Sequence, residues 1–356
     1  MRRSSAKTAA VLVLSFLCIH MAQSPSLGVV IRGGDGSGNT TAPTDDPGWA
    51  SVGLRGVGSA IYLGNGWVLT ANHVNIGSVT FDTIYSAQGT FHRLHDPNNT
   101  SVMADIGVFQ LSSIPAGLQG VTISSAAPST LSTITAIGYG CDRGAATTWD
   151  GYPGFLISAN RTKRWGENTI DASGITVKTS YGGTTSTLEV YFDMNGSGDN
   201  EFQGYKGDSG GAFFYKNGSN WQLAGMMVAI GPYTEQPDNM VLYGNATYAA
   251  DLSVYRDQIL AITAHPGDVN GDGIVNFLDY NIVKTNYLKT GVGWTGGDLN
   301  DDGVVSFLDY NIVKTHYLHT NAANGTGVLA VPEPATMSLL ILGGMATLIR
   351  RRNRRA

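Results

Sequence analysis

Three short segments of the chain carry residue types that could together cleave an acyl bond. They supply a serine within the glycine-rich run 207–211, a histidine just after the apolar run 67–70, and an aspartate at the start of a third run: Ser209, His73 and Asp105. A serine hydroxyl is a weak nucleophile that needs an adjacent imidazole as base, and a carboxylate must orient the imidazole. Flanking glycines let backbone N–H groups converge where a tetrahedral oxyanion would form. Each segment alone has an ordinary explanation, such as a core histidine, a turn-capping aspartate or a plain loop, but all three in this order indicate an active site.

Residues 266–320 hold a second set of candidate functional residues, in two copies offset by 30 positions. Calcium binds about six to eight oxygen atoms, and an EF-hand loop offers them at alternating positions around a glycine at a sharp turn. Gly273 and Gly303 stand at that turn. The candidate ligands are Asp268, Asn270, Asp272, the Ile274 carbonyl, Asn276 and Asp279 in the first copy, and Asp298, Asn300, Asp302, the Val304 carbonyl, Ser306 and Asp309 in the second. Each loop ends on Asp instead of the usual Glu, and without a cation its acids would repel one another.

The segments that must position these residues are mainly β-strands. Short apolar runs separated by Gly, Asn and Ser extend over residues 50–262, and Gly64-Asn65-Gly66 between two of them indicates a hairpin. The expected strands are 59–63, 67–70, 101–111, 132–139, 188–192, 212–215 and 221–230. One helix is expected at 251–262, where apolar residues recur on one face. The pattern predicts a mainly β barrel or sandwich, followed by short helices after each calcium loop.

Both ends of the chain carry targeting patterns. Residues 1–22 combine basic residues, a short apolar run and small residues at the cut, as a secretory signal peptide does. An uncleaved anchor is the alternative, but the run is short for a membrane span. Residues 331–356 place Pro-Glu-Pro before an apolar stretch and five arginines, which predicts a C-terminal transmembrane helix with a basic tail. Between the ends, composition predicts a loose leader at 23–49, a β domain at 50–262, the repeats at 263–320 and a polar linker at 321–330.

Charge and cysteine content exclude two classes of protein. The formal net charge is −5, and eight of the 22 basic residues lie in the terminal targeting segments. Residues 23–334 therefore carry 14 basic against 27 acidic residues, a net charge of −13. A body that acidic is a poor binder of nucleic acid. Removal of a signal peptide would take Cys18 and leave Cys141 alone, so the mature chain is not a disulfide-stapled scaffold.

Residues 50–262 resemble a trypsin-like serine protease of the chymotrypsin fold. Thr70-Ala71-Asn72-His73 is similar to the family's Thr-Ala-Ala-His, the run 105–108 to its Asp-Ile-Ala-Leu, and the run 137–140 to its Gly-Trp-Gly segment. Residues 225–228 resemble the strand that lines the substrate backbone. The resemblance implies a double β-barrel. It also implies that His73 is general base and then acid, Asp105 its orienting group, Ser209 the nucleophile, and the N–H groups of Gly207 and Ser209 the oxyanion hole.

Three features depart from the usual pattern of this family. The lack of disulfides is typical of a bacterial variant. Residues 30–34 match only loosely the new N-terminus that pairs with the acid before the serine, here Asp208, and no basic cleavage site precedes them. The specificity-pocket position, six residues before the serine, is Gln203 and not Asp. The resemblance therefore does not imply a preference for Arg or Lys.

The C-terminal third contains two further resemblances. Residues 266–320 closely resemble a type I dockerin, in which Asp at the last loop position is the norm. This implies a small α-helical domain with two bound Ca²⁺ ions and a possible cohesin-type partner, although calcium could also merely fold a spacer. Residues 331–356 resemble the PEP-CTERM sorting signal of Gram-negative bacteria. This implies export, recognition by an exosortase-type enzyme, and a location at the cell envelope or cell surface, with the chain anchored or released after processing.

Two functions follow from these expectations. The first is an exported serine endopeptidase that hydrolyses peptide bonds through an acyl-enzyme and carries a calcium-dependent docking module. The alternative is a catalytically silent adhesion or scaffold protein that keeps the protease fold and binds partners through the dockerin. The complete triad favours the enzyme, because inert homologues usually lose one of its members.

Overall fold

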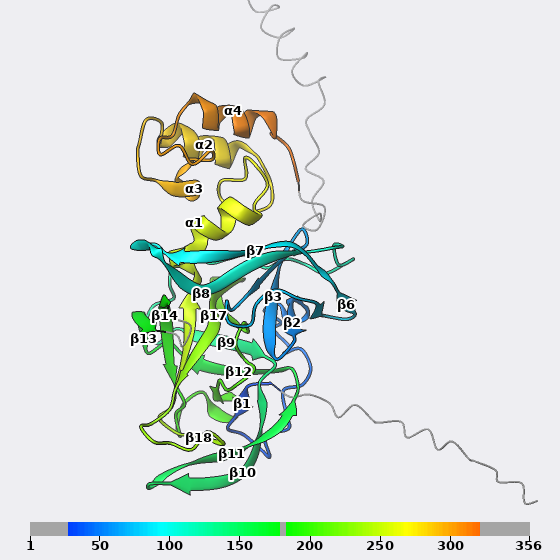
Figure 1. Ribbon diagram of the computed structural model, residues 1–356, viewed down its shortest axis with the longest axis vertical. Helices are drawn as coiled ribbons and strands as arrows, with labels where there is room; N and C mark the ends of the chain where they lie inside the picture. Colours follow the sequence, from blue (N-terminus) through cyan, green and yellow to red (C-terminus); the bar gives the residue numbers. More distant parts are fainter. Residues whose placement is uncertain (1–27, 179–182, 321–356) are drawn as a thin grey trace, which may run out of the picture.

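The computed structural model of the protein describes residues 28–178 and 183–320 (Figure 1). The signal peptide expected at 1–22, the linker at 321–330 and the C-terminal segment at 331–356 lie outside these residues. Among the helices that are described, none is both long enough and apolar enough to cross a membrane.

Two seven-stranded antiparallel sheets form the body of the molecule (Figure 1). The first has the order β6 (Ile84–Tyr85), β5 (Val79–Thr80), β2 (Val52–Arg55), β3 (Gly58–Gly64), β4 (Trp67–Thr70), β8 (Asn99–Leu111) and β7 (Ala87–Asp96). The second has the order β12 (Arg164–Thr169), β9 (Thr133–Gly138), β16 (Ala212–Asn217), β17 (Asn220–Gly231), β19 (Ala246–Asp251), β14 (Thr184–Tyr191) and β13 (Ala172–Lys178). The predicted mainly β architecture is confirmed, and each apolar run expected as a strand is one.

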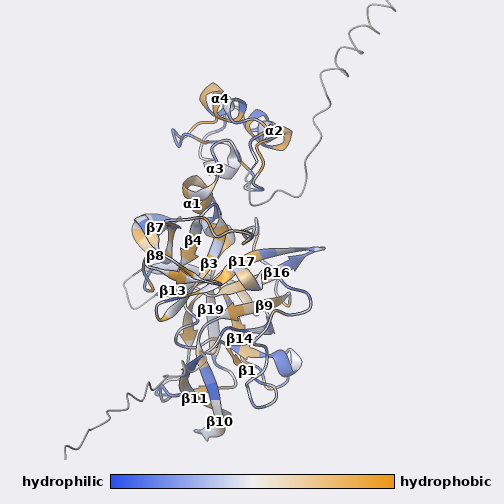
Figure 2. Ribbon diagram, turned by 90° about the vertical axis from the view of Figure 1, so that its right-hand side faces the viewer, coloured by the Kyte–Doolittle hydropathy of each residue, from blue (hydrophilic) through white to orange (hydrophobic). Residues whose placement is uncertain are grey.

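One hydrophobic core joins the two sheets. It combines Ile61 and Ile106 of the first sheet with Phe214 and Met226 of the second, all of them buried. Figure 2 shows hydrophobic residues along β9, β14 and β17. Burial of aliphatic and aromatic side chains is the main favourable term in folding, so this shared core fixes the two sheets against each other. The segments that carry His73, Asp105 and Ser209 adjoin these two sheets and depend on that arrangement.

Among the strands that the sequence reasoning missed are those of a polar hairpin. β10 (Cys141–Trp149) and β11 (Tyr152–Arg161) form a hairpin that pairs with β18 (Met240–Leu242), at the end of the molecule away from the helical domain (Figure 1). Few large apolar residues mark β10, so its burial signal is weak. The sequence does mark the turn between these strands, with the pair Asp150-Gly151. In the structure both residues have positive φ, at 48° and 82°. An Asp-Gly pair suits such a turn.

The segment expected as a loose leader instead packs against the body of the molecule from residue 28 onward. β1 (Val30–Ile31) pairs with β15 (Phe202–Gln203), and Val29, Val30 and Ile31 are all buried. Gly28 is equally confined, since a Cβ atom there would lie 2.3 Å from both the Arg164 nitrogen and the Gly138 oxygen. Glycine and polar content suggested a loose chain, but three consecutive branched apolar residues supply the burial that holds it. A short 3-10 helix, η1 (Trp49–Ser51), then leads into β2.

Four helices complete the described fold, three of them in the region that resembles a dockerin. α1 (Leu252–Thr263) begins at Asp251, whose side chain caps it by accepting from Ser253 N. α2 (Phe277–Thr285) and α4 (Phe307–Thr315) each begin with a capping box, and α3 (Gly293–Gly296) lies between them. These helices enclose a small core of their own, formed by Val269, Val275, Val283, Leu299, Val305 and Val313. The region thus has the burial pattern of a separate domain.

The helical domain is docked on α1 (Figure 1). The Arg256 guanidinium donates to the main-chain oxygen of Asn270 in the first loop and, at 3.4 Å, to that of Ile123 in the body. At the next residue, Oδ1 of Asp257 accepts from the Thr295 backbone nitrogen at 2.9 Å. Arg256 therefore links the body of the protein to the first predicted calcium loop.

This contact predicts the effect of substituting Arg256. In Arg256→Met the aliphatic stem is kept but both hydrogen bonds are lost, so the helical domain should detach more often. We expect faster limited proteolysis of the connection at residues 264–266, with cleavage rate as the readout. Val254→Ala, an exposed position on the same helix, is the control and should leave the rate unchanged. Equal rates in Arg256→Met and the unsubstituted protein would show that this contact does not hold the domain.

Candidate active site

His73 and Asp105 are brought together by the pairing of β4 with β8. Thr70 at the end of β4 lies opposite Gly107 of β8, so the turn that follows Thr70 lies beside Asp105. Nδ1 of His73 lies 2.7 Å from Oδ2 of Asp105, and the His73 backbone nitrogen donates to Oδ1 at 3.0 Å. The Asp105 side chain is 1% exposed and the His73 side chain 21%. The carboxylate is therefore buried behind an imidazole that reaches solvent.

This pairing selects one tautomer of the imidazole. An ionised carboxylate can only accept hydrogen bonds, so Nδ1 of His73 carries the proton and Nε2 carries the lone pair. The backbone nitrogen of Asp105 donates to Thr185 Oγ1 of the second sheet at 2.8 Å. Because Thr185 is fully buried, it fixes Asp105 across the contact between the sheets. Thr185 was not expected from the sequence, since a lone threonine in a strand gives no signal.

Ser209 is held next to the same strands. The backbone nitrogen of Ser59 in β3 donates to the Ser209 oxygen at 2.7 Å. A Cβ atom on Gly58 would lie 2.9 Å from that oxygen and 2.7 Å from Cγ2 of Val74, the neighbour of His73. Gly210 has φ 85°, and a Cβ atom there would lie 2.0 Å from the Ser59 oxygen. The structure thus brings His73 and Asp105 into contact and holds Ser209 against β3, close to the residue that follows His73. Glycine is required where the serine loop meets β3.

The same loop orients two backbone N–H groups. In a planar trans peptide the C=O and the following N–H point in opposite directions. The Lys206 oxygen accepts from Cys141 Sγ at 3.3 Å, which fixes the direction of the Gly207 N–H. The Asp208 oxygen accepts from Gly211 N at 2.7 Å, which fixes that of the Ser209 N–H. Burial raises the pKa of the Cys141 thiol, so this group keeps the proton that it donates.

Asp208 lies beneath the loop as a buried acid. Its Oδ1 accepts from Gly140 N at 2.7 Å, and its Oδ2 accepts from Tyr205 N at 2.9 Å. Burial raises the pKa of Asp208 to about 7, although these hydrogen bonds and the charge of Arg161 act in the opposite direction. The family resemblance implies that a new N-terminus would pair with the Asp208 carboxylate. In this structure main-chain N–H groups bind that carboxylate.

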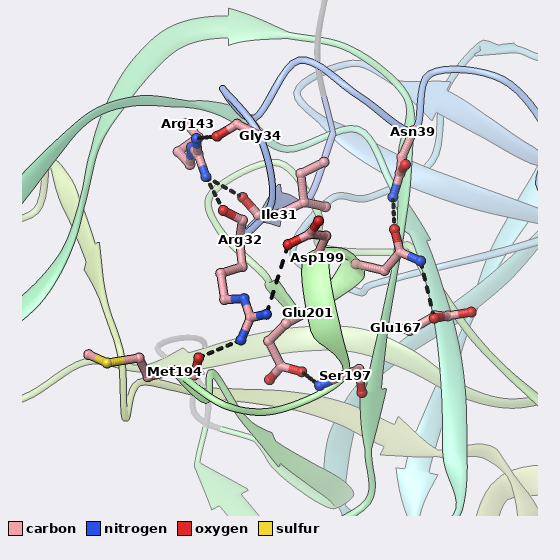
Figure 3. A network of polar contacts seen from close by, with 11 residues as sticks. Ile31, Arg32, Gly34, Asn39, Arg143, Glu167, Met194, Ser197, Asp199 and Glu201 are labelled. Carbon is pink, nitrogen blue, oxygen red and sulfur yellow. Dashed lines mark hydrogen bonds and ion pairs between the residues drawn. The ribbon is translucent and has the colours of Figure 1, made fainter.

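A network of polar contacts ties the N-terminal segment to the loop that precedes the serine (Figure 3). The Arg143 guanidinium donates to the main-chain oxygens of Ile31, Arg32 and Gly34. Glu201 is fully buried and accepts from the backbone nitrogens of Asp193 and Ser197. Because β1 pairs directly with β15, this network supports the backbone just before the residues that flank Ser209.

Gln203 does not lie where a specificity residue would contact substrate. It is 1% exposed, and its amide nitrogen donates to the main-chain oxygens of Gly204 at 3.0 Å and Ala246 at 2.9 Å. A cavity opens beside Ser209, but it is lined by other residues of the same loop and of β17 and β19. Gln203 lines a neighbouring, smaller cavity. Counting six residues back from Ser209 could not show which of these two cavities Gln203 lines.

The two predicted calcium loops lead into α2 and α4. Oδ1 of Asp279 accepts from Val269 N and Asn270 N, and its Oδ2 accepts from Asn276 N. The second loop repeats this arrangement around Asp309. Asp279 and Asp309 are fully buried, and Asp268 and Asp298 are nearly so. The first and last acids of each loop are thus enclosed by the loop backbone.

The donor set of these loops fits calcium. Burial raises the pKa of Asp268 to about 6, and the nearby carboxylates of Asp272 and Asp279 raise it as well, so a bound cation would relieve this cost. Across residues 28–178 and 183–320, no three His, Cys, Asp or Glu side chains form a group that could hold a metal by themselves. The amide, hydroxyl and main-chain oxygens of each loop are needed too, as a cation with about six to eight oxygen ligands requires.

Comparison with known families divides the chain in the same way. The Trypsin family model matches residues 35–252, the Dockerin type I domain matches residues 266–318, and the PEP-CTERM protein-sorting motif matches residues 330–355. The three resemblances drawn from the sequence are confirmed. The trypsin match begins inside the segment expected as a leader, in agreement with the packing of that segment against the body.

Several solved protease structures are similar to this chain at low sequence identity. The Rv3671c protease from M. tuberculosis in its active form is 15% identical, with a TM-score of 0.37, over 60% of this chain and 79% of that chain. The HtrA-type protease AlgW with a decapeptide is 18% identical, with a TM-score of 0.36, over 61% and 55%. The NS6 protease from murine norovirus 1 is 15% identical, with a TM-score of 0.34, over 59% and 93%. No curated protein matches the sequence.

The environment of Asp208 predicts a pH dependence of stability. The unfolded chain releases the Asp208 proton near its ordinary pKa of 3.8, whereas the folded protein holds it up to about 7. Between these values the folded state binds more protons, so the free energy of unfolding falls as pH rises, by at most about 1.4 kcal/mol per pH unit. Denaturant unfolding in a Ser209→Ala background, with and without Asp208→Asn, measures this slope. The Asn variant should lose the Asp208 contribution, and parallel slopes would contradict it.

Proposed function

We propose that this chain, which belongs to the trypsin family of serine peptidases, is an exported endopeptidase that cleaves peptide bonds through Ser209, His73 and Asp105. The observation that carries the proposal is the short contact of 2.7 Å between His73 Nδ1 and a carboxylate that is almost completely buried. A structural role would not require the imidazole to be exposed while its partner is enclosed. Here Val74, the residue after His73, lies beside Gly58 of β3, next to the Ser209 oxygen.

In the first half of the reaction, Ser209 Oγ attacks the carbonyl carbon of the scissile peptide. His73 Nε2 takes the hydroxyl proton as the bond forms, and Asp105 stabilises the imidazolium that results. Negative charge develops on the carbonyl oxygen, where the N–H groups of Gly207 and Ser209 donate to it. His73 then gives the proton to the leaving amine, the C–N bond breaks, and an acyl-enzyme ester on Ser209 remains.

In the second half, water replaces the amine. His73 accepts a proton from water, whose oxygen attacks the ester carbonyl, and the same two N–H groups stabilise the second oxyanion. The ester bond breaks and Ser209 recovers its proton from His73. Both halves use the same residues because the imidazole alternates between base and acid without changing position.

The remaining modules support a location at the cell envelope and a docking role. The PEP-CTERM motif indicates export and sorting to the cell envelope of a Gram-negative bacterium. The dockerin domain indicates calcium binding and a cohesin-type partner. We propose that it binds two Ca²⁺ ions, one per loop, and that an exosortase-type enzyme processes the C-terminus, so that the protease is anchored in the membrane or released.

The triad predicts a large effect of a small change at Asp105. Asp105→Asn keeps the shape of the side chain but its amide favours the wrong imidazole tautomer. We expect kcat for peptide hydrolysis to fall by about 10⁴-fold with little change in thermal stability. Asp82→Asn, at an exposed turn, is the matched control and should keep full activity. Unchanged turnover in Asp105→Asn would mean that another acid orients the base, or that hydrolysis does not use this site.

Calcium binding has its own test, independent of hydrolysis. Titration calorimetry of the calcium-free protein should give two bound ions, and Asp279→Ala or Asp309→Ala should each leave one, because each removes the last acid of one loop. Chelation should reduce the helical circular dichroism signal of residues 266–320 while most hydrolysis persists, since the triad lies in sheets with a separate core. No binding of calcium, or unchanged stoichiometry in both variants, would contradict the assignment of the loops.

A further inference from the structure

A cavity of about 130 Å³ opens directly beside Ser209. One side is formed by the loop from Gly204 to Ser209, and the other by neighbouring strands β17 and β19. A pocket next to the nucleophile of a serine peptidase receives the side chain of the residue whose carbonyl is attacked, and so sets which peptides are cleaved. The lining of this cavity therefore bears on the substrate of the proposed reaction.

The strand side of the cavity is aliphatic. Met227, Val228, Ala229 and Ile230 follow one another along β17 and line it, and Thr247 of β19 is the register partner of Ile230. The Thr247 hydroxyl is already occupied, because its Oγ1 accepts from Gly204 N at 2.9 Å. Because side chains alternate along a strand, some of these residues line the cavity with their backbone and others with their side chains, and none of the side chains carries a charge.

The charged groups near the cavity are engaged elsewhere. Asp208 lines it, but it is completely buried and both of its oxygens accept main-chain N–H groups, those of Gly140 and Tyr205. The Lys206 ammonium is exposed and lies 3.1 Å from Asp238 at the surface. A basic substrate side chain would therefore have to be desolvated without an available carboxylate, which is costly. For an acidic side chain, the one cation that lines the cavity among the described residues is Lys206, which is paired with Asp238.

Ile230 limits the size of the cavity. Together with Tyr205 it lines both this cavity and a second one of about 30 Å³, in which Gln203 lies. Ile230 therefore lies between the space next to Ser209 and the space next to Gln203. An apolar protein cavity of about 150 Å³ holds a single benzene ring, so the 130 Å³ beside Ser209 matches an aliphatic side chain better than a benzyl or phenol group.

We propose that this cavity selects an uncharged aliphatic residue, of about the size of valine or leucine, on the acyl side of the scissile bond, and that Ile230 sets its depth. The inference rests on the proposed function and adds its substrate class. It also explains why Gln203, at the position expected for a specificity residue, is buried and bonded to Ala246 instead of facing substrate.

The test is a set of internally quenched peptides that differ only at the residue before the scissile bond: Ala, Val, Leu, Phe, Arg and Glu. We expect kcat/KM for Val or Leu to exceed that for Phe, Arg and Glu by at least about tenfold, the discrimination that a few methylene groups or an unpaired charge produce. Cleavage sites are confirmed by mass spectrometry. Preferred cleavage after Arg, Glu or Phe would overturn the inference.

Two variants separate the role of Ile230 from a general disturbance of the fold. Ile230→Ala should raise the ratio of Phe to Leu cleavage by at least about tenfold, because it merges the two spaces. Met240→Ala is the matched control, since Met240 lines only the smaller cavity, and it should leave the ratio unchanged. An unchanged ratio in Ile230→Ala would show that Ile230 does not set the depth.

The outcomes also separate this inference from the function on which it rests. If no peptide is cleaved, the proposed endopeptidase function fails and the specificity fails with it. If peptides are cleaved but after charged or aromatic residues, the function stands and only the assignment of the pocket is wrong.

Discussion

The site depends on one buried serine, Ser59, where the two sheets meet. Its backbone nitrogen donates to the Ser209 oxygen, and its own oxygen accepts from Thr70 Oγ1 of β4 at 2.7 Å. Its hydroxyl donates to the Gly207 oxygen at 3.1 Å and accepts from Tyr139 N at 3.0 Å. A fully buried residue with all of these groups bonded fixes its neighbours closely, because leaving any one unpaired would cost about 1–3 kcal/mol. The strand before His73 and the loop around Ser209 are held to each other through it.

The remaining contacts secure each side of this junction. Thr185 of the second sheet fixes Asp105, and Asp105 fixes the imidazole. On the other side, β1 and the Arg143 network support the chain that leads into the serine loop. The helical domain is attached at a different place, on α1, and has its own core. The molecule therefore combines a proposed hydrolytic centre between two sheets with a docked domain whose proposed calcium loops lie outside that centre.

Sequence reasoning identified the parts of the fold whose residues are distinctive in type and spacing. Alternating or continuous apolar runs marked the inner strands, and the repeated acidic loops marked the dockerin. It failed where a strand has no distinctive apolar run, or where local composition does not report how the segment packs. β10 is polar, the segment after Gly28 lies in a glycine-rich region, and Gln203 occupies the expected position yet turns away from the cavity. Ser59 and Thr185 could not be found at all, because their roles come from contacts between segments distant in the chain.

The central claim is that Ser209 is an activated nucleophile, and reaction with a fluorophosphonate probe tests it most directly. The probe forms a covalent bond to a serine oxygen only when a base removes the proton and the oxyanion is stabilised. The purified folded protein should be labelled on Ser209, and Ser209→Ala should not be labelled. A folded protein that resists the probe, or labelling that persists in Ser209→Ala, would contradict the account.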